Sequence, residues 1–330
     1  MLESIIFTIN QILPLLLVIG LGQLIFKLKI IDDNFIKQSN KYIFKAGLPI
    51  YLFFEIFNIA SFNDINWWFI IYALGALIVI YLVGMIVVIL TIKDRKQKAV
   101  VLQAAFRPNF GIIGVPLAKE LGSLQASAHA AVLAAFLIPI SNILSILSLS
   151  YYAPKDANNQ SIKKVLLNII KNPVIIGVLT GLVVLLLKPY LTFLQIDSTA
   201  PFLYKGIKMI ASITTPFALL ILGAGFRFKT NKVEGKSIVI TVLLRNLISP
   251  VLILGITVLL HHYNILTFGE IGYPALIALS CAPSAVSTVS LAAQMKQDER
   301  LAGNIVVWTS IISIFVIVTV TMIFKYSGLI

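Results

Sequence analysis

The chain has 330 residues, of which 59% are hydrophobic and 12% charged, and its mean hydropathy is +0.98. Because soluble domains carry roughly a quarter charged residues, this composition excludes an ordinary water-soluble fold. The net charge of +13 could indicate nucleic-acid binding in a soluble protein, but here the basic residues lie between apolar segments. Cys281 is the single cysteine, which excludes an intrachain disulfide and a cysteine-based metal site.

Apolar segments long enough to cross a membrane, which takes about 20 residues each, follow one another along the whole chain. Ten are predicted, over residues 5–26, 35–58, 67–92, 99–121, 127–151, 165–187, 203–226, 237–261, 271–294 and 302–326. The connections between them are short. The sequence therefore predicts an all-α polytopic membrane protein with ten transmembrane helices.

The basic residues alternate along the chain. Lysine and arginine gather in the odd-numbered connections, as in the run Lys93, Arg95, Lys96 and Lys98, and are sparse in the even-numbered ones. By the positive-inside rule the odd-numbered connections are cytoplasmic, which places both termini outside. The expected location is the plasma membrane.

Two of the segments contain residues that interrupt a helix. The fourth reads RPNFGIIGVP over residues 107–116, and the ninth reads CAPSAVST over residues 281–288. Proline removes a backbone donor and clashes with the preceding turn, so both segments should unwind inside the membrane. Unwound backbone at that depth must lie against protein or a water-filled cavity, and paired breaks of this kind indicate a transport site.

The chain also has the signs of an internal duplication. Proline and glycine recur in the same order in both halves, and the pairs are Pro14 with Pro173, Gly22 with Gly181, Pro49 with Pro216, and Pro108 with Pro283. The halves, residues 1–151 and 152–330, would each hold five helices, and an odd number inverts the second half relative to the first. The predicted fold is thus two inverted five-helix repeats whose broken fourth and ninth segments cross near the middle of the membrane.

Taken together, these motifs resemble the auxin efflux carrier family, which includes bacterial malate permease-like proteins and the plant PIN auxin exporters. The matching residues are Pro108, Asn109, Gly114, Val115, Pro116, Leu117, Lys171, Asn172, Pro173, Gly181, Thr215, Pro216, Leu222, Gly223, Arg245, Pro250, Ala282, Pro283, Ala292 and Met295. In two places the chain departs from the family. Ser280 stands where many bacterial members have an acidic residue, and Thr288 stands where PIN-like members have a second proline. This difference argues against a coupling mechanism that needs a carboxylate there.

The resemblance implies both an architecture and a substrate class. The first, second, sixth and seventh segments would form a scaffold. The third to fifth and eighth to tenth would form a transport domain that carries the crossing and moves like an elevator. The substrate would be a small organic anion, a carboxylate similar to malate or auxin.

The site is expected at the crossing, where each half-helix that follows a break directs free N–H groups and its positive dipole end toward the gap. Pro116 suits the first turn of one half-helix, and Ser287 or Thr288 suits the N-cap of the other. The residues predicted to bind substrate are Arg107, Pro108, Asn109, Gly111, Gly114, Pro283, Ser284, Ser287 and Thr288.

Three charged residues inside the segments keep alternative interpretations. Arg107 is expected to contact substrate, to hold a carbonyl group at the break, or to extend to the cytoplasmic interface, and the three alternatives stay open. Extension to the cytoplasmic interface is the prediction for Arg245. Glu55 is either proton-linked or paired with a lysine or water. Because neither break contains a carboxylate, transport is expected not to require sodium, as uniport or as proton-linked movement.

The predicted function is a secondary transporter of a small organic anion, and the alternative is a membrane sensor or regulatory subunit that binds a similar anion without moving it. No nucleotide-binding loop, HExxH pair or Ser/His/Asp arrangement supports an enzyme, and no metal or cofactor is expected. The expected partners are the substrate and the lipid bilayer, with no nucleic acid, while a homodimer stays open.

Overall fold

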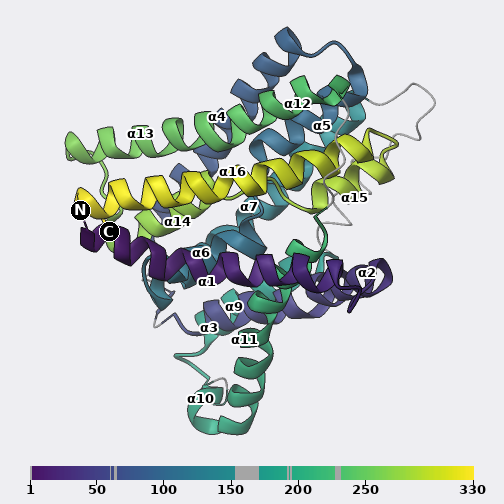
Figure 1. The fold of residues 1–330 in the computed structure, drawn as a ribbon. Coiled ribbons are helices and arrows are strands. Elements are labelled where there is room, and N and C mark those ends of the chain that lie inside the picture. Colours follow the sequence, from purple (N-terminus) through teal and green to yellow (C-terminus); the bar gives the residue numbers. More distant parts are fainter. Residues whose placement is uncertain are drawn as a thin grey trace.

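The helices of the chain fall into two bodies (Figure 1). The computed structural model describes residues 2–59, 61–62, 65–152, 171–191, 193, 195–226 and 232–330. The smaller body contains α1 (Leu2–Lys27), α2 (Asp33–Tyr42), η1 (Ile43–Gly47), α3 (Leu48–Phe57), α9 (Pro173–Leu187), α10 (Ile196–Thr199) and α11 (Pro201–Ala224). The larger body contains α4 (Trp67–Thr91), α5 (Arg95–Phe106), η3 (Phe110–Gly114), α6 (Val115–Leu121), α7 (Leu124–Tyr151), α12 (Lys232–Val242), η5 (Leu243–Ile248), α13 (Ser249–His262), α14 (Gly269–Cys281), α15 (Ser287–Gln294) and α16 (Glu299–Tyr326).

Apart from segment ends and the two breaks, at 107–109 and 282–286, the predicted segments coincide with helices where the structure describes them. Residues 165–170 of the sixth segment lie outside the described residues. Five helices among the described residues are long and apolar enough to cross a membrane: Trp67–Thr91, Leu124–Tyr151, Pro201–Ala224, Glu234–His262 and Glu299–Tyr326. Ile12–Lys27 and Pro173–Leu187 are shorter apolar helices. The all-α class is therefore confirmed, while the count of ten crossings stays a prediction because several segments consist of shorter helices.

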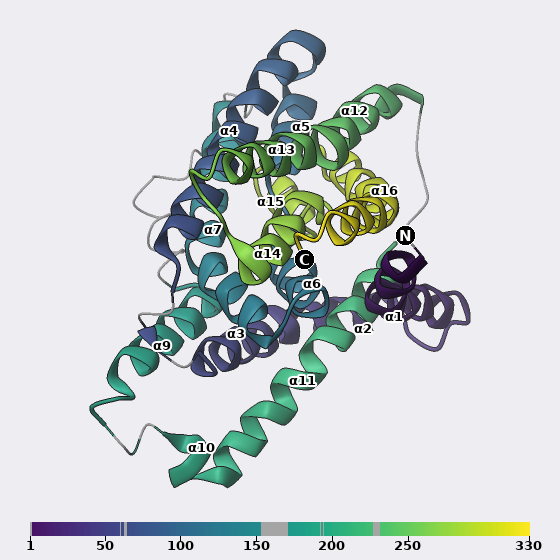
Figure 2. The ribbon, with the colours of Figure 1, turned by 90° about the vertical axis from the view of Figure 1, so that its left-hand side faces the viewer.

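The surface of α4 is apolar on the sides that no other helix covers. Trp68, Ile71 and Leu90 are 68%, 58% and 78% exposed, respectively. Soluble monomers rarely expose contiguous apolar surface of this extent, whereas hydrocarbon chains are its natural neighbours. In both Figure 1 and Figure 2, α4 runs along the edge of the larger body, and one of its ends points away from the smaller body.

Three π-helical segments have a common cause in the sequence. Each of η1, η3 and η5 ends two residues before a proline, namely Pro49, Pro116 and Pro250, respectively. A proline has no N–H to give to the preceding turn, and its ring crowds the carbonyl four residues upstream. A wider turn relieves that clash. Such turns are frequent at functional sites; η1 and η3 line the cavity described below, and η5 bonds the end of α14 beside it.

The smaller body is held together by close backbone approaches at glycine. A Cβ atom at Gly22 of α1 would lie 1.9 Å from the carbonyl oxygen of Leu220, and one at Gly223 of α11 would lie 1.9 Å from that of Ile19. In the same way, a Cβ atom at Gly177 of α9 would lie 2.5 Å from the carbonyl oxygen of Pro49. Membrane helices associate through such small-residue contacts because lipid removes the hydrophobic drive between them.

We expect Gly223→Ala to lower the free energy of unfolding by at least about 2 kcal/mol, because the obstructing atom belongs to a backbone and cannot rotate away. Gly206→Ala is the matched control, since it lies in the same helix and has nothing within 4 Å of the added Cβ. The melting temperatures of both variants in detergent provide the test. Equal melting temperatures would contradict the close packing of α1 against α11.

Candidate functional site

The two broken segments meet in the larger body, as predicted. α5 ends at Phe106 and α14 ends at Cys281. The two segments that follow pair through an antiparallel bridge between Pro108 and Ser284. The N–H of Asn109 donates to the carbonyl of Pro283 at 2.8 Å, and the N–H of Ala285 donates to that of Arg107 at 3.0 Å. Groups freed by one break therefore satisfy groups freed by the other, as buried backbone requires.

Polar side chains from neighbouring helices hold this crossing in place. Gln103 donates to the carbonyl of Thr288 at 3.1 Å, and the hydroxyl of Ser284 donates to the carbonyl of Ala104 at 2.7 Å. The N–H of Ser284 donates to the hydroxyl of Thr309, in α16, at 3.3 Å. These bonds link α5, α15 and α16, so the crossing is a rigid part of the larger body.

Two expectations about local roles at the crossing have different outcomes. Pro116 lies in the first turn of α6, as predicted. The prediction that Ser287 or Thr288 caps α15 is wrong, because the N-cap is Val286 and no side chain caps that helix. Val286 already has helical backbone angles there, whereas a side-chain cap needs an extended residue before the helix.

A cavity of about 570 Å³ lies against the crossing, and we call it the crossing cavity. Among the residues predicted to bind substrate, those that line it are Arg107, Pro108, Asn109, Gly111 and Ser287. Its other walls come from η1, α3, α7, α15 and the start of α9. The cavity therefore lies between the larger body, which supplies the crossing, and the smaller body, which supplies η1, α3 and α9.

The remaining predicted residues lie behind the cavity wall. Ser284 and Thr288 are fully buried, and Pro283 faces a small apolar pocket of about 40 Å³. Gly114 lies beneath the ring of Phe110, whose Cδ2 atom would be 2.4 Å from an added Cβ. These positions support the crossing, and none of them lines the crossing cavity.

The side chains of Arg107 and Asn109 carry hydrogen-bond donors that the described residues do not use. Arg107 is 7% exposed; its Nη2 donates to the side-chain oxygen of Asn142 in α7, and its Nη1 has no partner. Asn109 is 5% exposed, and its side-chain nitrogen also has no partner. An unpaired buried donor is costly. Both residues line the crossing cavity, while the two unpaired nitrogen atoms themselves lie buried beneath its surface.

The charges around the crossing cavity have a single sign. Arg107, Lys45 and Lys171 are the charged residues that line it, and no carboxylate belongs to the lining among the described residues. The N-terminus of α9, at Asn172 and Pro173, also faces the cavity and adds its positive dipole end. A cleft lined by one sign of charge attracts ligands of the opposite sign.

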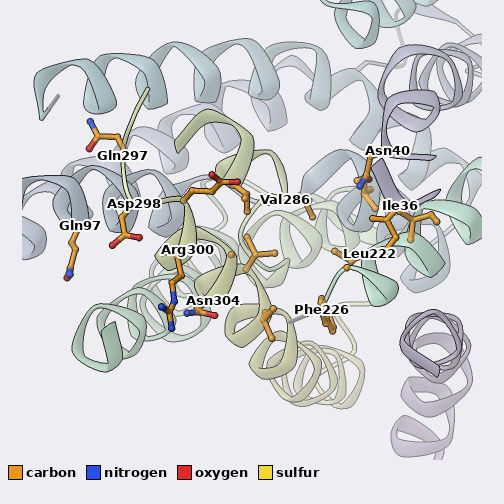
Figure 3. A pocket seen from close by; sticks show the side chains of 18 of the residues that line it. Ile36, Asn40, Gln97, Leu222, Phe226, Val286, Gln297, Asp298, Arg300 and Asn304 are labelled. Carbon is orange, nitrogen blue, oxygen red and sulfur yellow. The ribbon is translucent and has the colours of Figure 1, made fainter. Parts of the chain in front are cut away.

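A second cavity, of about 1190 Å³, has a mixed lining (Figure 3). Its charged residues are Asp94, Lys96, Asp298, Glu299 and Arg300. Asp94 and Asp298 accept hydrogen bonds from the first turns of α5 and α16, so they act as helix caps. Ile112 lines both cavities. The two cavities are therefore neighbours at η3, and the smaller of the two has the cationic lining.

Arg245 does not extend to the interface, so that prediction is wrong. It is 1% exposed and donates to the carbonyls of Leu279, Ser280 and Ala282 at the end of α14. The π-turn of η5 contains this residue. From sequence, the position of Arg245 is known only as its distance along the chain from the cytoplasmic connection. The π-turn that directs its side chain toward α14 is a property of the folded structure.

Glu55 pairs with a lysine, as one of its two interpretations expected. It is 1% exposed in α3, and its Oε1 lies 3.3 Å from the Nζ of Lys119 in α6. The ion pair therefore links the smaller body to the larger one. Glu55 lines neither of the two cavities at the crossing.

Several residues of the site carry no signal in the broken motifs. Asn142, which accepts from Arg107, and Lys45, on the opposite wall, come from α7 and η1. Gln103 is a fully buried amide in α5. An amide within an apolar membrane segment is itself a weak signal, because it needs a partner there, and it could have pointed to Gln103 and Asn142.

The fold and the crossing together define a multi-pass membrane protein with two broken helices at its centre, an arrangement typical of transporters. A family model described as membrane transport protein matches residues 7–322. The chain therefore belongs to the membrane transport protein family, also called the auxin efflux carrier family. This is a family of transporters and not of enzymes. Comparison with curated proteins gives no match.

Proposed function

We propose that the chain is a secondary transporter of a small organic anion and that the crossing cavity is its substrate site. The observation that carries the proposal is the pair of unused donors, Nη1 of Arg107 and the side-chain nitrogen of Asn109, against a cavity without lining carboxylates. Arginine binds a carboxylate through parallel hydrogen bonds. The volume of about 570 Å³ falls in the range of small-molecule sites, so a malate-like or auxin-like carboxylate fits.

An elevator-type movement is proposed for the two bodies, with the smaller as scaffold and the larger as transport domain. The substrate site lies between them, and its binding groups belong to the rigid larger body. Movement of that body against the scaffold would carry Arg107 and Asn109 with the ligand. The close glycine contacts of α1 with α11 and of α9 with α3 support a scaffold that stays fixed.

Inverted repeats, residues 1–151 and 152–330, are part of the proposal, and the helix contacts support them. If α1 corresponds to α9 and α3 to α11, the contact of α1 with α11 has its counterpart in that of α9 with α3. Likewise, α5 packs on α16 and α14 packs on α7, as expected if α5 corresponds to α14 and α7 to α16. A common pattern of contacts in two halves is what duplication produces.

The proposed orientation places the crossing cavity on the cytoplasmic side of a plasma-membrane protein whose termini lie outside. Lys45 and Lys171, which line the cavity, flank the first and fifth connections, which the positive-inside rule assigns to the cytoplasm. In this conformation, substrate would therefore be loaded from the cytoplasm. Uniport and proton-linked movement are both compatible with this arrangement.

Uptake into proteoliposomes separates the transporter from the alternative, a sensor that binds the same anion without moving it. We expect uptake of radiolabelled malate or indole acetate, reduced by Asn109→Ala about tenfold or more because a hydrogen bond to a charged ligand is lost. Asn40→Ala is the matched control, since this amide lines the other cavity. Saturable binding without uptake would favour the sensor. Unchanged uptake by Asn109→Ala would contradict the proposed site.

A further inference from the structure

Arg245 is a fully buried cation whose partners are backbone carbonyls. Its Nε donates to the carbonyl of Ala282 at 2.8 Å, and its Nη2 donates to that of Ser280 at 3.0 Å and to that of Leu279. Among the described residues, no carboxylate forms an ion pair with it. The charge of Arg245 is therefore compensated by carbonyl oxygens alone.

These carbonyls form the C-terminal end of the half-helix α14, which stops at Cys281. The last carbonyls of a helix lack intrahelical partners and carry the negative end of its dipole. Broken membrane helices present such carbonyls to bound monovalent cations. Here the guanidinium of Arg245 occupies that position.

The neighbouring residue in η5, Asn246, anchors this turn to α16, next to the end of α14 that the guanidinium contacts. The side-chain nitrogen of Asn246 donates to the carbonyl of Thr309 at 3.2 Å and to the hydroxyl of Ser313 at 2.7 Å. Thr309 in turn bonds the N–H of Ser284 in the crossing. The side chain of Arg245 is thus held by the same network that holds the broken segment.

We propose that Arg245 is a built-in cation that fills a carbonyl site at the end of α14, a site that would otherwise require a soluble monovalent cation. The inference rests on the proposed transport function and extends it. Because the chain itself supplies the cation at this site, no soluble ion has to bind there, and transport would not depend on a gradient of that ion. Removal of the guanidinium should expose the site. The protein should then depend on a cation from solution.

The test measures the melting temperature of the full-length protein in detergent, with choline chloride as the base salt and millimolar guanidinium, sodium or potassium chloride added. Arg245→Ala should melt more than about 5 °C below the wild type in choline, and guanidinium should restore most of the loss. The wild type should respond equally to all the salts. Arg300→Ala, at a half-exposed arginine paired with Glu234, is the control and should show no specific restoration.

A second pair of variants keeps the test decisive if Arg245→Ala does not fold. Arg245→Lys retains the charge, and Arg245→Gln retains donors without charge, so only the lysine variant should melt near the wild type in choline. Equal stability of the two variants, absence of restoration by any cation, or sodium-specific stabilisation of the wild type would overturn the proposal. The melting measurement needs no substrate, so a failure of the proposed transport function would leave its outcome unchanged.

Discussion

Replacing Arg107 by glutamine is expected to weaken the binding of an anionic substrate about 30-fold. The guanidinium is nearly buried and has an unused donor at the wall of the crossing cavity. A hydrogen bond to a charged group is worth about 2 kcal/mol, which corresponds to that factor. A neutral analogue of the same shape lacks the Coulomb attraction, so its affinity should change by less than about twofold. Isothermal titration of both ligands measures the difference.

Lys45→Gln is the matched control for this measurement. It removes the same charge from the same cavity, but Lys45 is exposed on the opposite wall. Solvent and salt screen an exposed charge, so the loss of affinity should be small and should disappear as the salt concentration rises. If Arg107→Gln weakens the anion and the neutral analogue equally, Arg107 supports the fold of the crossing and does not recognise charge.

The positions of the two breaks could be predicted from sequence, although proline alone does not explain them. Other prolines lie inside continuous helices, among them Pro14, Pro139, Pro216 and Pro274. Pro108 and Pro283 differ because the groups they free find partners across the crossing, where Asn109 bonds Pro283 and Ala285 bonds Arg107. A break inside a membrane persists only where such partners exist. Proline together with glycine or with other helix-interrupting residues in a short stretch identified the correct pair, but the pairing itself is a tertiary property.

The candidate site could be predicted only where it is local in the chain. Arg107 and Asn109 belong to a break, so their place at the crossing follows from the motif. Asn142 and Lys45 reach the same cavity from distant segments, and one sequence without a fold cannot bring them together. Ser284 and Thr288 have the same hydroxyl chemistry as Ser287, yet only Ser287 lines the cavity. Which of these residues faces the cavity depends on the residue at which α15 begins. No side chain caps the start of α15, so the sequence does not mark that residue.

We infer the energy source of the proposed transport from where the charges of the site lie. The cations of the crossing cavity are fixed to the chain, no described carboxylate lines that cavity, and Arg245 covers the carbonyls at the end of α14. Sodium sites need several oxygen ligands and commonly a carboxylate. The crossing contains no carboxylate, so a sodium site there would have to consist of carbonyls and the hydroxyls of Ser287 and Thr288. Glu55 is the buried acid nearest to a coupling role, because its ion pair with Lys119 joins the two bodies that the proposed movement would separate.

We therefore expect transport to proceed without sodium, in uptake assays where sodium is replaced by potassium or choline at fixed pH and membrane potential. Under uniport, each net charge carried by the substrate biases its distribution by about 2.3 kcal/mol per 100 mV, or roughly 50-fold. Under proton-linked movement, protonation of Glu55 would release Lys119 and let the bodies separate, so Glu55→Gln should abolish the dependence on a pH gradient. Lys119→Gln is the matched control, because it removes the ion pair and keeps the titratable carboxyl. An absolute sodium requirement would refute both forms, and a pH dependence that survives in Glu55→Gln would exclude this residue as the proton carrier.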